Sequence, residues 1–233
     1  MTVSAYEQAR QVGFDALLAR AAGGDASSWA ALGAVHEHGM IVLSALNRRL
    51  RVDLAQREVW VEDADGGPVP AGSDLAATPP RAVGTRARAA WAVLALHYAC
   101  AGDVAPDARE VSFSHFADCR SYLAVFGKRI VGRFLATAGR TDPEFARRSE
   151  SVGGVRLPGS GVRYQFHVLP RVPIAIVRYE GDAELAPGAS VVYRADAERL
   201  LPAEDRVVAA ELLLDALAGK LMGETEVPHE RRL

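Results

Sequence analysis

The strand-like segments of this chain fall into two separate runs, and helical segments lie before, between and after them. The first run covers residues 40–61 and the second covers residues 164–194. A doubly wound parallel sheet would require strands and helices to alternate, whereas strands grouped in runs are typical of antiparallel sheets packed beside helices. The order of the segments therefore predicts an α+β fold.

The N-terminal part is predicted to contain a helix followed by an antiparallel meander. Apolar residues recur at helical spacing over residues 3–22, and Gly23 with Gly24 ends this helix. A short second helix is expected to run through Val35. The hydrophobic pattern then changes to alternation, which predicts three strands at residues 40–46, 49–54 and 59–61.

The same helical and alternating spacings of apolar residues predict the central helices and the second β block. Helices are predicted at residues 84–101 and 113–138, the latter broken near Cys119 or Gly127, and a short helix begins with Asp142 as its cap. The strands of the second antiparallel block are expected at residues 164–169, 172–179 and 190–194, and the closing C-terminal helix at residues 202–221. The strand at residues 172–179 is predicted to be central because both its faces are apolar.

Residues 63–80 are rich in glycine, proline, aspartate and alanine, which predicts an irregular loop. The meander before this loop is too small to form a stable core of its own, so residues 1–233 are expected to fold as one domain. The alternative is a small N-terminal lobe at residues 1–62, joined by the loop to a second region at residues 81–222.

Charge and cysteine content restrict where the protein acts. The formal net charge is -2, whereas nucleic acid attracts a strongly basic face, so no nucleic-acid partner is expected. No stretch reaches the roughly 18 apolar residues of a membrane span, and charged side chains interrupt residues 1–20 where a signal peptide would be apolar. Cys100 and Cys119 form no CxxC pair. These features indicate a cytoplasmic protein with free thiols and no membrane partner.

Four short segments follow one another between residues 96 and 205. They are Leu96-His97-Tyr98; Val111-Ser112-Phe113 with Tyr122, Phe126 and Arg129 after it; Leu169-Pro170-Arg171-Val172-Pro173; and Leu201-Pro202-Ala203-Glu204-Asp205. With these segments in this order, the chain from about residue 90 to residue 221 resembles DUF3786, a bacterial and archaeal family of unknown function. The resemblance implies the boundaries of the fold rather than an activity.

The acidic segment departs from the pattern of this family. The family often carries an acidic pair followed by Phe-Pro, where this chain has Glu180, Asp182 and Glu184 before Leu185-Ala186-Pro187. The family is also associated with corrinoid or iron–sulfur metabolism in anaerobes. That association transfers poorly to this chain, because it lacks the cysteine spacing that holds a cluster.

His36 and His38 flank Glu37 just before the first predicted strand. In an extended segment both imidazoles would point to the same side, which is the geometry of a bidentate metal contact. A third ligand would have to come from elsewhere in the chain. The alternative is a pair of partly exposed histidines at a junction between a helix and a strand.

A second group of histidines and cysteines lies on the central helices. His97 and Cys100 are predicted to share one helix face, and so are His115 and Cys119. Together these four side chains would form a zinc-binding set, or Cys119 would be a nucleophile activated by a nearby histidine. The alternative is that the cysteines and histidines are ordinary buried residues.

A ligand pocket is predicted between the second β block and the helix at residues 113–138. Arg178 is in phase with the apolar residues of its strand, and Arg129 lies on the helical face of Phe126, so both arginines are directed toward the core. A buried guanidinium needs an anionic partner, which is either an anionic ligand or the carboxylate of Glu180. The predicted ligand-binding residues are Tyr98, Tyr122, Arg129, His167 and Arg178.

These patterns leave three functional hypotheses. The first is a protein that binds a small, anionic molecule, in which any catalytic step would use histidine as a general acid or base. The second is a metal-dependent enzyme that uses His36, His38 and an acidic residue, and the third is a non-catalytic interaction protein. No P-loop, GxGxxG, GxSxG or HExxH motif occurs, so no cofactor is predicted. The candidate catalytic residues are His97, His115, Cys119 and His167, and the oligomeric state is left open.

Overall fold

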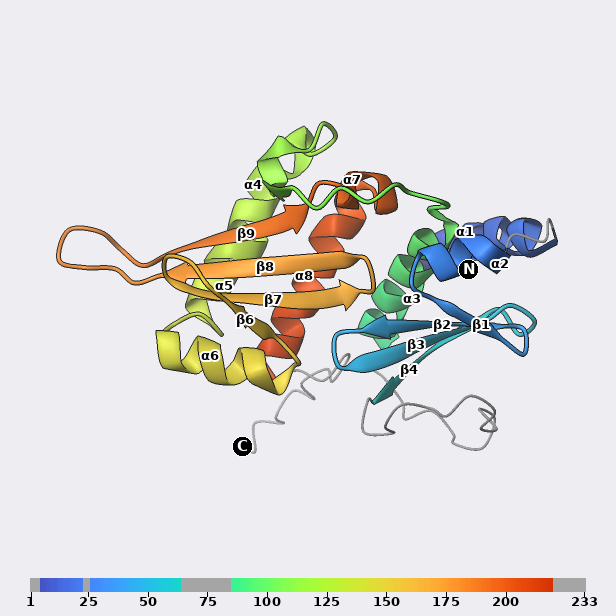
Figure 1. Cartoon of the computed structure of the whole chain (residues 1–233), viewed down its shortest axis with the longest axis horizontal. Helices are drawn as coiled ribbons and strands as arrows, with labels where there is room; N and C mark the ends of the chain where they lie inside the picture. Colours follow the sequence, from blue (N-terminus) through green and yellow to red (C-terminus); the bar gives the residue numbers. More distant parts are fainter. Residues whose placement is uncertain (1–4, 23–25, 64–84, 220–233) are drawn as a thin grey trace, which may run out of the picture.

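The computed structural model describes residues 5–22, 26–63 and 85–219. It contains one antiparallel sheet of four strands and another of five, with helices beside each of them (Figure 1). The predicted α+β class is therefore confirmed. The predicted loop at residues 63–80 lies outside the described residues, except for Asp63 at the end of a strand.

The N-terminal sheet is a meander in the order β1-β2-β3-β4. Helix α1 (Ala5–Ala22) packs along α3 (Thr85–Cys100), and a Cβ at Gly13 would lie 2.9 Å from Cβ of Leu96. Only glycine allows the two helices to approach this closely. The sheet has one strand more than the three predicted, because β1 is too short to show an alternating pattern. The remaining elements are α2 (Ala26–Ala31), β1 (Val35–Glu37), β2 (Met40–Ala45), β3 (Arg48–Asp53) and β4 (Glu58–Asp63).

The C-terminal sheet has the order β5-β9-β8-β7-β6, so the predicted central strand is confirmed as the central one. Seven of its residues, from Val172 to Arg178, are buried. The two outer strands have three residues each, and the sequence pattern did not predict them. The strands are β5 (Glu110–Ser112), β6 (Val155–Leu157), β7 (Val162–Leu169), β8 (Val172–Tyr179) and β9 (Gly188–Arg194).

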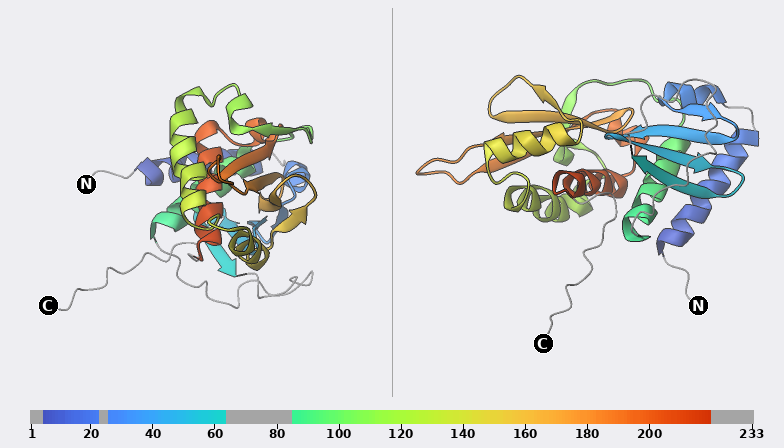
Figure 2. Two further views of the ribbon diagram at one scale, coloured as in Figure 1. Left: turned by 90° about the vertical axis from the view of Figure 1, so that its left-hand side faces the viewer. Right: turned by 90° about the horizontal axis from the view of Figure 1, so that it is seen from below.

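Helices α5, α6 and α8 cover one face of the C-terminal sheet (Figure 2). The segment predicted as one broken helix at residues 113–138 is made of shorter pieces, including a π-helical segment that starts at the predicted break at Gly127. The cap of α6 is Thr141, whose hydroxyl accepts from the N–H of Glu144, so the prediction of Asp142 as cap was wrong. The helical elements are η1 (Phe113–His115), η2 (Arg120–Tyr122), α4 (Leu123–Phe126), η3 (Gly127–Gly132), α5 (Arg133–Ala136), α6 (Asp142–Ser151), α7 (Ala197–Leu200) and α8 (Ala203–Leu217).

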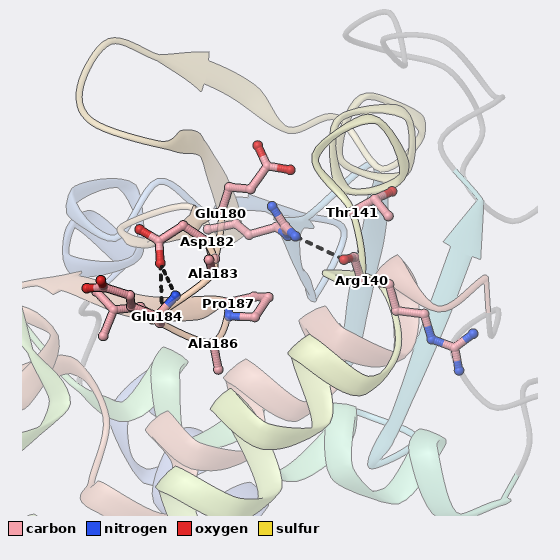
Figure 3. Close-up of a pocket in the computed structure, with 11 residues that line it drawn as sticks. Arg140, Thr141, Glu180, Asp182, Ala183, Glu184, Ala186 and Pro187 are labelled. Atoms are coloured by element: carbon pink, nitrogen blue, oxygen red, sulfur yellow. Dashed lines mark hydrogen bonds between the residues drawn. The ribbon is translucent and has the colours of Figure 1, made fainter.

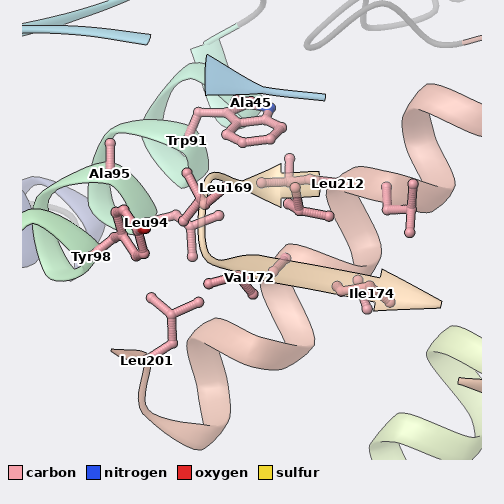
Figure 4. Close-up of a cluster of buried hydrophobic side chains, with 14 of the residues drawn as sticks. Ala45, Trp91, Leu94, Ala95, Tyr98, Leu169, Val172, Ile174, Leu201 and Leu212 are labelled. Atoms are coloured by element: carbon pink, nitrogen blue, oxygen red, sulfur yellow. The ribbon is translucent and has the colours of Figure 1, made fainter. Parts of the chain in front are cut away.

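The two sheets share one hydrophobic core. Figure 4 shows Trp91 of α3 beside Ala45 from the first sheet and Leu169 from the second, and all three side chains are buried. The backbone N–H of Leu46 donates to the carbonyl of His167 at 2.7 Å, which ties the turn after β2 to β7. The end of α3 is therefore held between the two sheets, next to the start of α8.

Candidate functional site

A histidine and a carboxylate meet where the C-terminal end of α3 reaches the N-terminal end of α8. Nδ1 of His97 lies 2.6 Å from Oδ2 of Asp205. His97 is in the last turn of α3, where the helix dipole favours a cation, and Asp205 is in the first turn of α8, where it favours an anion. The local electrostatics of both helix ends therefore stabilise the same ion pair.

The hydrogen bond determines which ring nitrogen of His97 is available for chemistry. A carboxylate accepts but does not donate, so the proton of the neutral imidazole is held on Nδ1 and the lone pair is on Nε2. The hydrogen bond from Asp205 raises the pKa of His97, against the opposing effect of burial. The side chain of Asp205 is 8% exposed and that of His97 is 34% exposed, so the ring remains open to solvent while its partner is buried.

A second polar pair lies beside the first. Oη of Tyr122 in η2 is 3.5 Å from Oε2 of Glu204, the residue before Asp205 in α8. Loss of solvent and the negative charge of Glu204 raise the pKa of Tyr122, so its hydroxyl remains protonated and able to donate. The same carboxylate contributes to the raised pKa of His97. The negative charges of Glu204 and Asp205 therefore act on both the imidazole of His97 and the phenol of Tyr122.

The family model of DUF3786, described as a domain of unknown function, matches residues 26–216. The chain belongs to the DUF3786 family. The match begins at α2 and so includes the first sheet, which the sequence resemblance from about residue 90 had left out. No curated protein and no solved structure matches the chain. In this DUF3786 protein, the His97 to Asp205 contact joins two of the four segments on which the resemblance was based.

Two of the predicted ligand-binding residues have structural partners instead. Tyr98 is fully buried, and its hydroxyl donates to the carbonyl of Leu32 at 2.6 Å and accepts from the N–H of Arg171 at 3.1 Å. Burial raises the pKa of Tyr98. Arg129 is 52% exposed and its guanidinium is paired with Glu211 of α8 at 2.5 Å. Both side chains in this DUF3786 protein are thus engaged by other residues of the chain.

Arg178 is buried, as its strand phase predicted, but its partner differs from the predicted one. Its guanidinium donates to the carbonyls of Gly139 at 2.7 Å and Arg140 at 2.9 Å, and it forms an ion pair with Asp142. Glu180, the predicted internal partner, is exposed at the end of β8. The guanidinium therefore fastens β8 to the connection between α5 and α6.

The register of the C-terminal sheet separates Arg178 from His167. Val162 of β7 pairs with Arg178, whereas His167 pairs with Pro173, an odd number of residues away along β8. Successive side chains of a strand point to opposite faces, so Arg178 and His167 lie on opposite sides of the sheet. The five predicted ligand-binding residues are consequently not gathered in one cavity.

A shallow groove of about 460 Å³ runs beside the projecting loop between β8 and β9 (Figure 3). Its lining includes Glu180, Asp182 and Glu184 as well as Arg140 and Arg178. Asp182 accepts from the backbone N–H groups of Glu184 and Leu185, both at 2.8 Å, so its carboxylate stabilises the loop itself. The groove presents acidic side chains and no free guanidinium of Arg178 to a ligand.

The backbone around the two histidines predicted as metal ligands differs from the extended segment that the prediction assumed. His36 is in β1 and its ring lies 4.8 Å from that of Trp29. His38 has φ 51, in the left-handed region, so the segment is not extended and the assumed alternation does not apply. Among the residues that the structure describes, no group of three His, Cys, Asp or Glu side chains is arranged to hold a metal ion.

The zinc-binding set predicted on the central helices of this DUF3786 protein is not assembled among the described residues. Nδ1 of His115 contacts Oγ of Ser112 at 2.7 Å, and the thiol of Cys119 points to the carbonyl of Ser114 at 3.5 Å. The thiol of Cys100 points to the carbonyl of Gly13 at 3.8 Å, and burial raises its pKa. Neither thiol contacts a histidine among the described residues, and His97 turns to Asp205 instead of Cys100.

The partner of His97 had no signal in the sequence. Asp205 stands out in the sequence only as the last residue of the fourth segment, and 108 residues separate it from His97. The four segments of the family resemblance contained both residues, but nothing in them indicated that the two side chains meet.

Within residues 5–22, 26–63 and 85–219, none of the helices has the length and apolar composition needed to span a bilayer.

Proposed function

We propose that the protein binds a small molecule beside His97 and that the imidazole acts on it as a general acid or base. The observation that carries this proposal is the 2.6 Å contact between Nδ1 of His97 and Oδ2 of Asp205. A carboxylate in this position fixes the ring orientation and stabilises the imidazolium that forms when Nε2 takes up a proton. Chemistry of this kind requires no redox cofactor.

Comparison with the other candidate histidines favours His97. The ring of His115 is engaged by the hydroxyl of Ser112, and His167 lies on the outer side of β7, where Nδ1 is 3.3 Å from the carbonyl of Pro170. Neither has a carboxylate partner within the described part of the chain. Nε2 of His97 makes no hydrogen bond to any described residue, which leaves it available to a ligand.

The charges around His97 support a neutral or cationic ligand. Glu204 and Asp205 both act on the imidazole, and Tyr122 presents a hydroxyl to the same carboxylates. The expectation of an anionic ligand depended on Arg129 and Arg178, and both guanidinium groups are engaged by carboxylates of the chain itself. Repulsion by two adjacent carboxylates would disfavour an anion at His97.

We place this activity in the cytoplasm. Cys100 and Cys119 are both free, as is usual for thiols in a reducing compartment. The ligand is proposed to be a soluble small molecule rather than a nucleic acid or a lipid surface. The balanced net charge of -2 supports this choice, because nucleic acids and anionic membranes attract strongly basic proteins.

A ligand panel tests the proposal directly. Neutral, cationic and carboxylated compounds of matched size would be screened by thermal shift against the parent, His97→Asn and Asp205→Asn proteins. We expect at least one neutral or cationic compound to stabilise the parent and to lose that effect in both variants. The control is His115→Asn, which should bind as the parent does. Equal binding by His97→Asn and the parent would refute the proposal.

A further inference from the structure

We propose that Asp118 is a positioning residue for His97 and acts through the first turn of α8. This inference rests on the proposed function of His97, but its geometry is independent of any ligand. Asp118 lies in the segment between η1 and η2, and both of its carboxylate oxygens contact the turn of α8 that carries Asp205. It touches neither His97 nor Asp205 among the contacts of the described residues.

The start of α8 has no cap of its own. The N-cap residue is Pro202, which has no side-chain acceptor for the free N–H groups of the first turn. Oδ2 of Asp118 accepts from the backbone N–H of Ala203 at 3.0 Å, although 85 residues separate them. A distant carboxylate thus performs the role that serine or aspartate usually performs within the helix itself.

The other carboxylate oxygen of Asp118 holds the same turn through a second contact. Oδ1 forms an ion pair with Arg206, whose side chain is fully buried. The guanidinium of Arg206 also donates to the carbonyl of Leu201 at 2.5 Å, and its central carbon lies 4.2 Å from the ring centre of Phe116. Stacking on an aromatic face and pairing with a carboxylate fix a guanidinium in one plane.

Asp205 lies between the two contact points of Asp118. Ala203 and Arg206 fix the turn on either side of it, so the rotation of Asp205 about the helix axis is fixed too. A rotation of one residue is about 100° in an α-helix, and even a small part of it would lengthen the contact with His97. The side chain of Asp118 is 45% exposed, so truncating it opens no cavity.

The test measures the pKa of the His97 imidazole by NMR titration in Asp118→Ala and Asp118→Asn proteins. Both changes remove the same charge, so a purely electrostatic role lowers the pKa equally in both. If Asp118 positions the turn, the pKa of His97 should fall further in Asp118→Ala than in Asp118→Asn, by about 0.5 or more. The reason is that asparagine keeps an acceptor for the N–H of Ala203. The control is Asp107→Ala, which removes another arginine-paired carboxylate and should leave His97 unchanged.

The Arg206→Met variant provides an independent test, because the two roles change the pKa of His97 in opposite directions. Loss of a nearby cation would raise the pKa of His97, whereas loss of positioning lowers it. Equal falls in the two Asp118 variants, no change in either, or a rise in Arg206→Met would overturn the inference. If Arg206→Met does not fold, the two Asp118 variants decide. The ligand panel separates this result from the proposed function, since unaltered binding by His97→Asn refutes the function whatever the role of Asp118.

Discussion

Nδ1 of His97 lies 2.6 Å from Oδ2 of Asp205, although the two residues are 108 positions apart in the chain. The contact joins the last turn of α3 to the first turn of α8. It places a partly exposed imidazole against a buried carboxylate, which is the arrangement that prepares a histidine for proton transfer. The predictions below follow from this contact and from the packing that holds it.

The contact makes stability depend on pH. The folded-state pKa of His97 is raised above its ordinary value of 6.5, so the protonated ring stabilises the fold fully below that value. This stabilisation is lost as the pH rises through the folded-state pKa. We expect about 1 kcal/mol after allowance for partial exposure. Urea unfolding at pH 6 and pH 9 measures it, and the pH-dependent difference should be smaller in His97→Gln by that amount.

The two arginines that were predicted to bind a ligand should differ in their effect on stability. Arg178→Met leaves the buried carbonyl of Gly139, the carbonyl of Arg140 and the carboxylate of Asp142 without their donor, so we expect a loss of about 2–4 kcal/mol. Arg129→Met removes an exposed ion pair and should cost less than about 1 kcal/mol. Chemical denaturation measures both. Similar losses of unfolding free energy in the two variants would contradict the conclusion that Arg178 links β8 to the connection between α5 and α6.

The shared core predicts that both sheets unfold together. Trp91 packs between them and Leu46 is hydrogen-bonded to His167 across the junction. We therefore expect the slowest-exchanging amides of β3 and β8 to report the same free energy of opening in native-state hydrogen exchange. Opening of β3 at a clearly lower free energy than β8 would instead show a separate N-terminal lobe.

The dispersed histidines and cysteines predict that no transition metal is bound tightly. His36 contacts Trp29, and His38 has a left-handed backbone. Elemental analysis of protein purified without chelator should find zinc and iron well below one per chain. Near-stoichiometric metal that disappears in a His36→Ala, His38→Ala double variant would restore the metal-dependent hypothesis.

The periodicity of the sequence was enough to predict the class of fold and its longer elements. Alternation and apolar runs located β2, β3, β4, β7, β8 and β9, and the apolar strand was correctly expected at the centre of its sheet. Strands β1, β5 and β6 have three residues each and are too short for any spacing to be recognised. The left-handed residue His38 also follows no hydrophobic pattern, so the metal hypothesis assumed the wrong backbone.

The candidate site was less accessible to sequence reasoning, because it depends on pairing between distant segments. The strand phase of Arg178 correctly indicated burial, but only the register of β7 against β8 shows that His167 lies on the opposite face. His97 was among the candidate catalytic residues, yet its partner Asp205 belongs to another helix. Which helix ends meet is decided by tertiary packing and cannot be inferred from local spacing.

The most direct test of this account is the nitrogen-15 NMR spectrum of the His97 ring across a pH titration. We expect a pKa above 6.5 and, at high pH, a neutral ring with its proton on Nδ1 and its lone pair on Nε2. In Asp205→Asn the pKa should fall toward the ordinary value. A pKa at or below 6.5 in the parent, or a neutral ring protonated on Nε2, would contradict the pairing on which the proposed function rests.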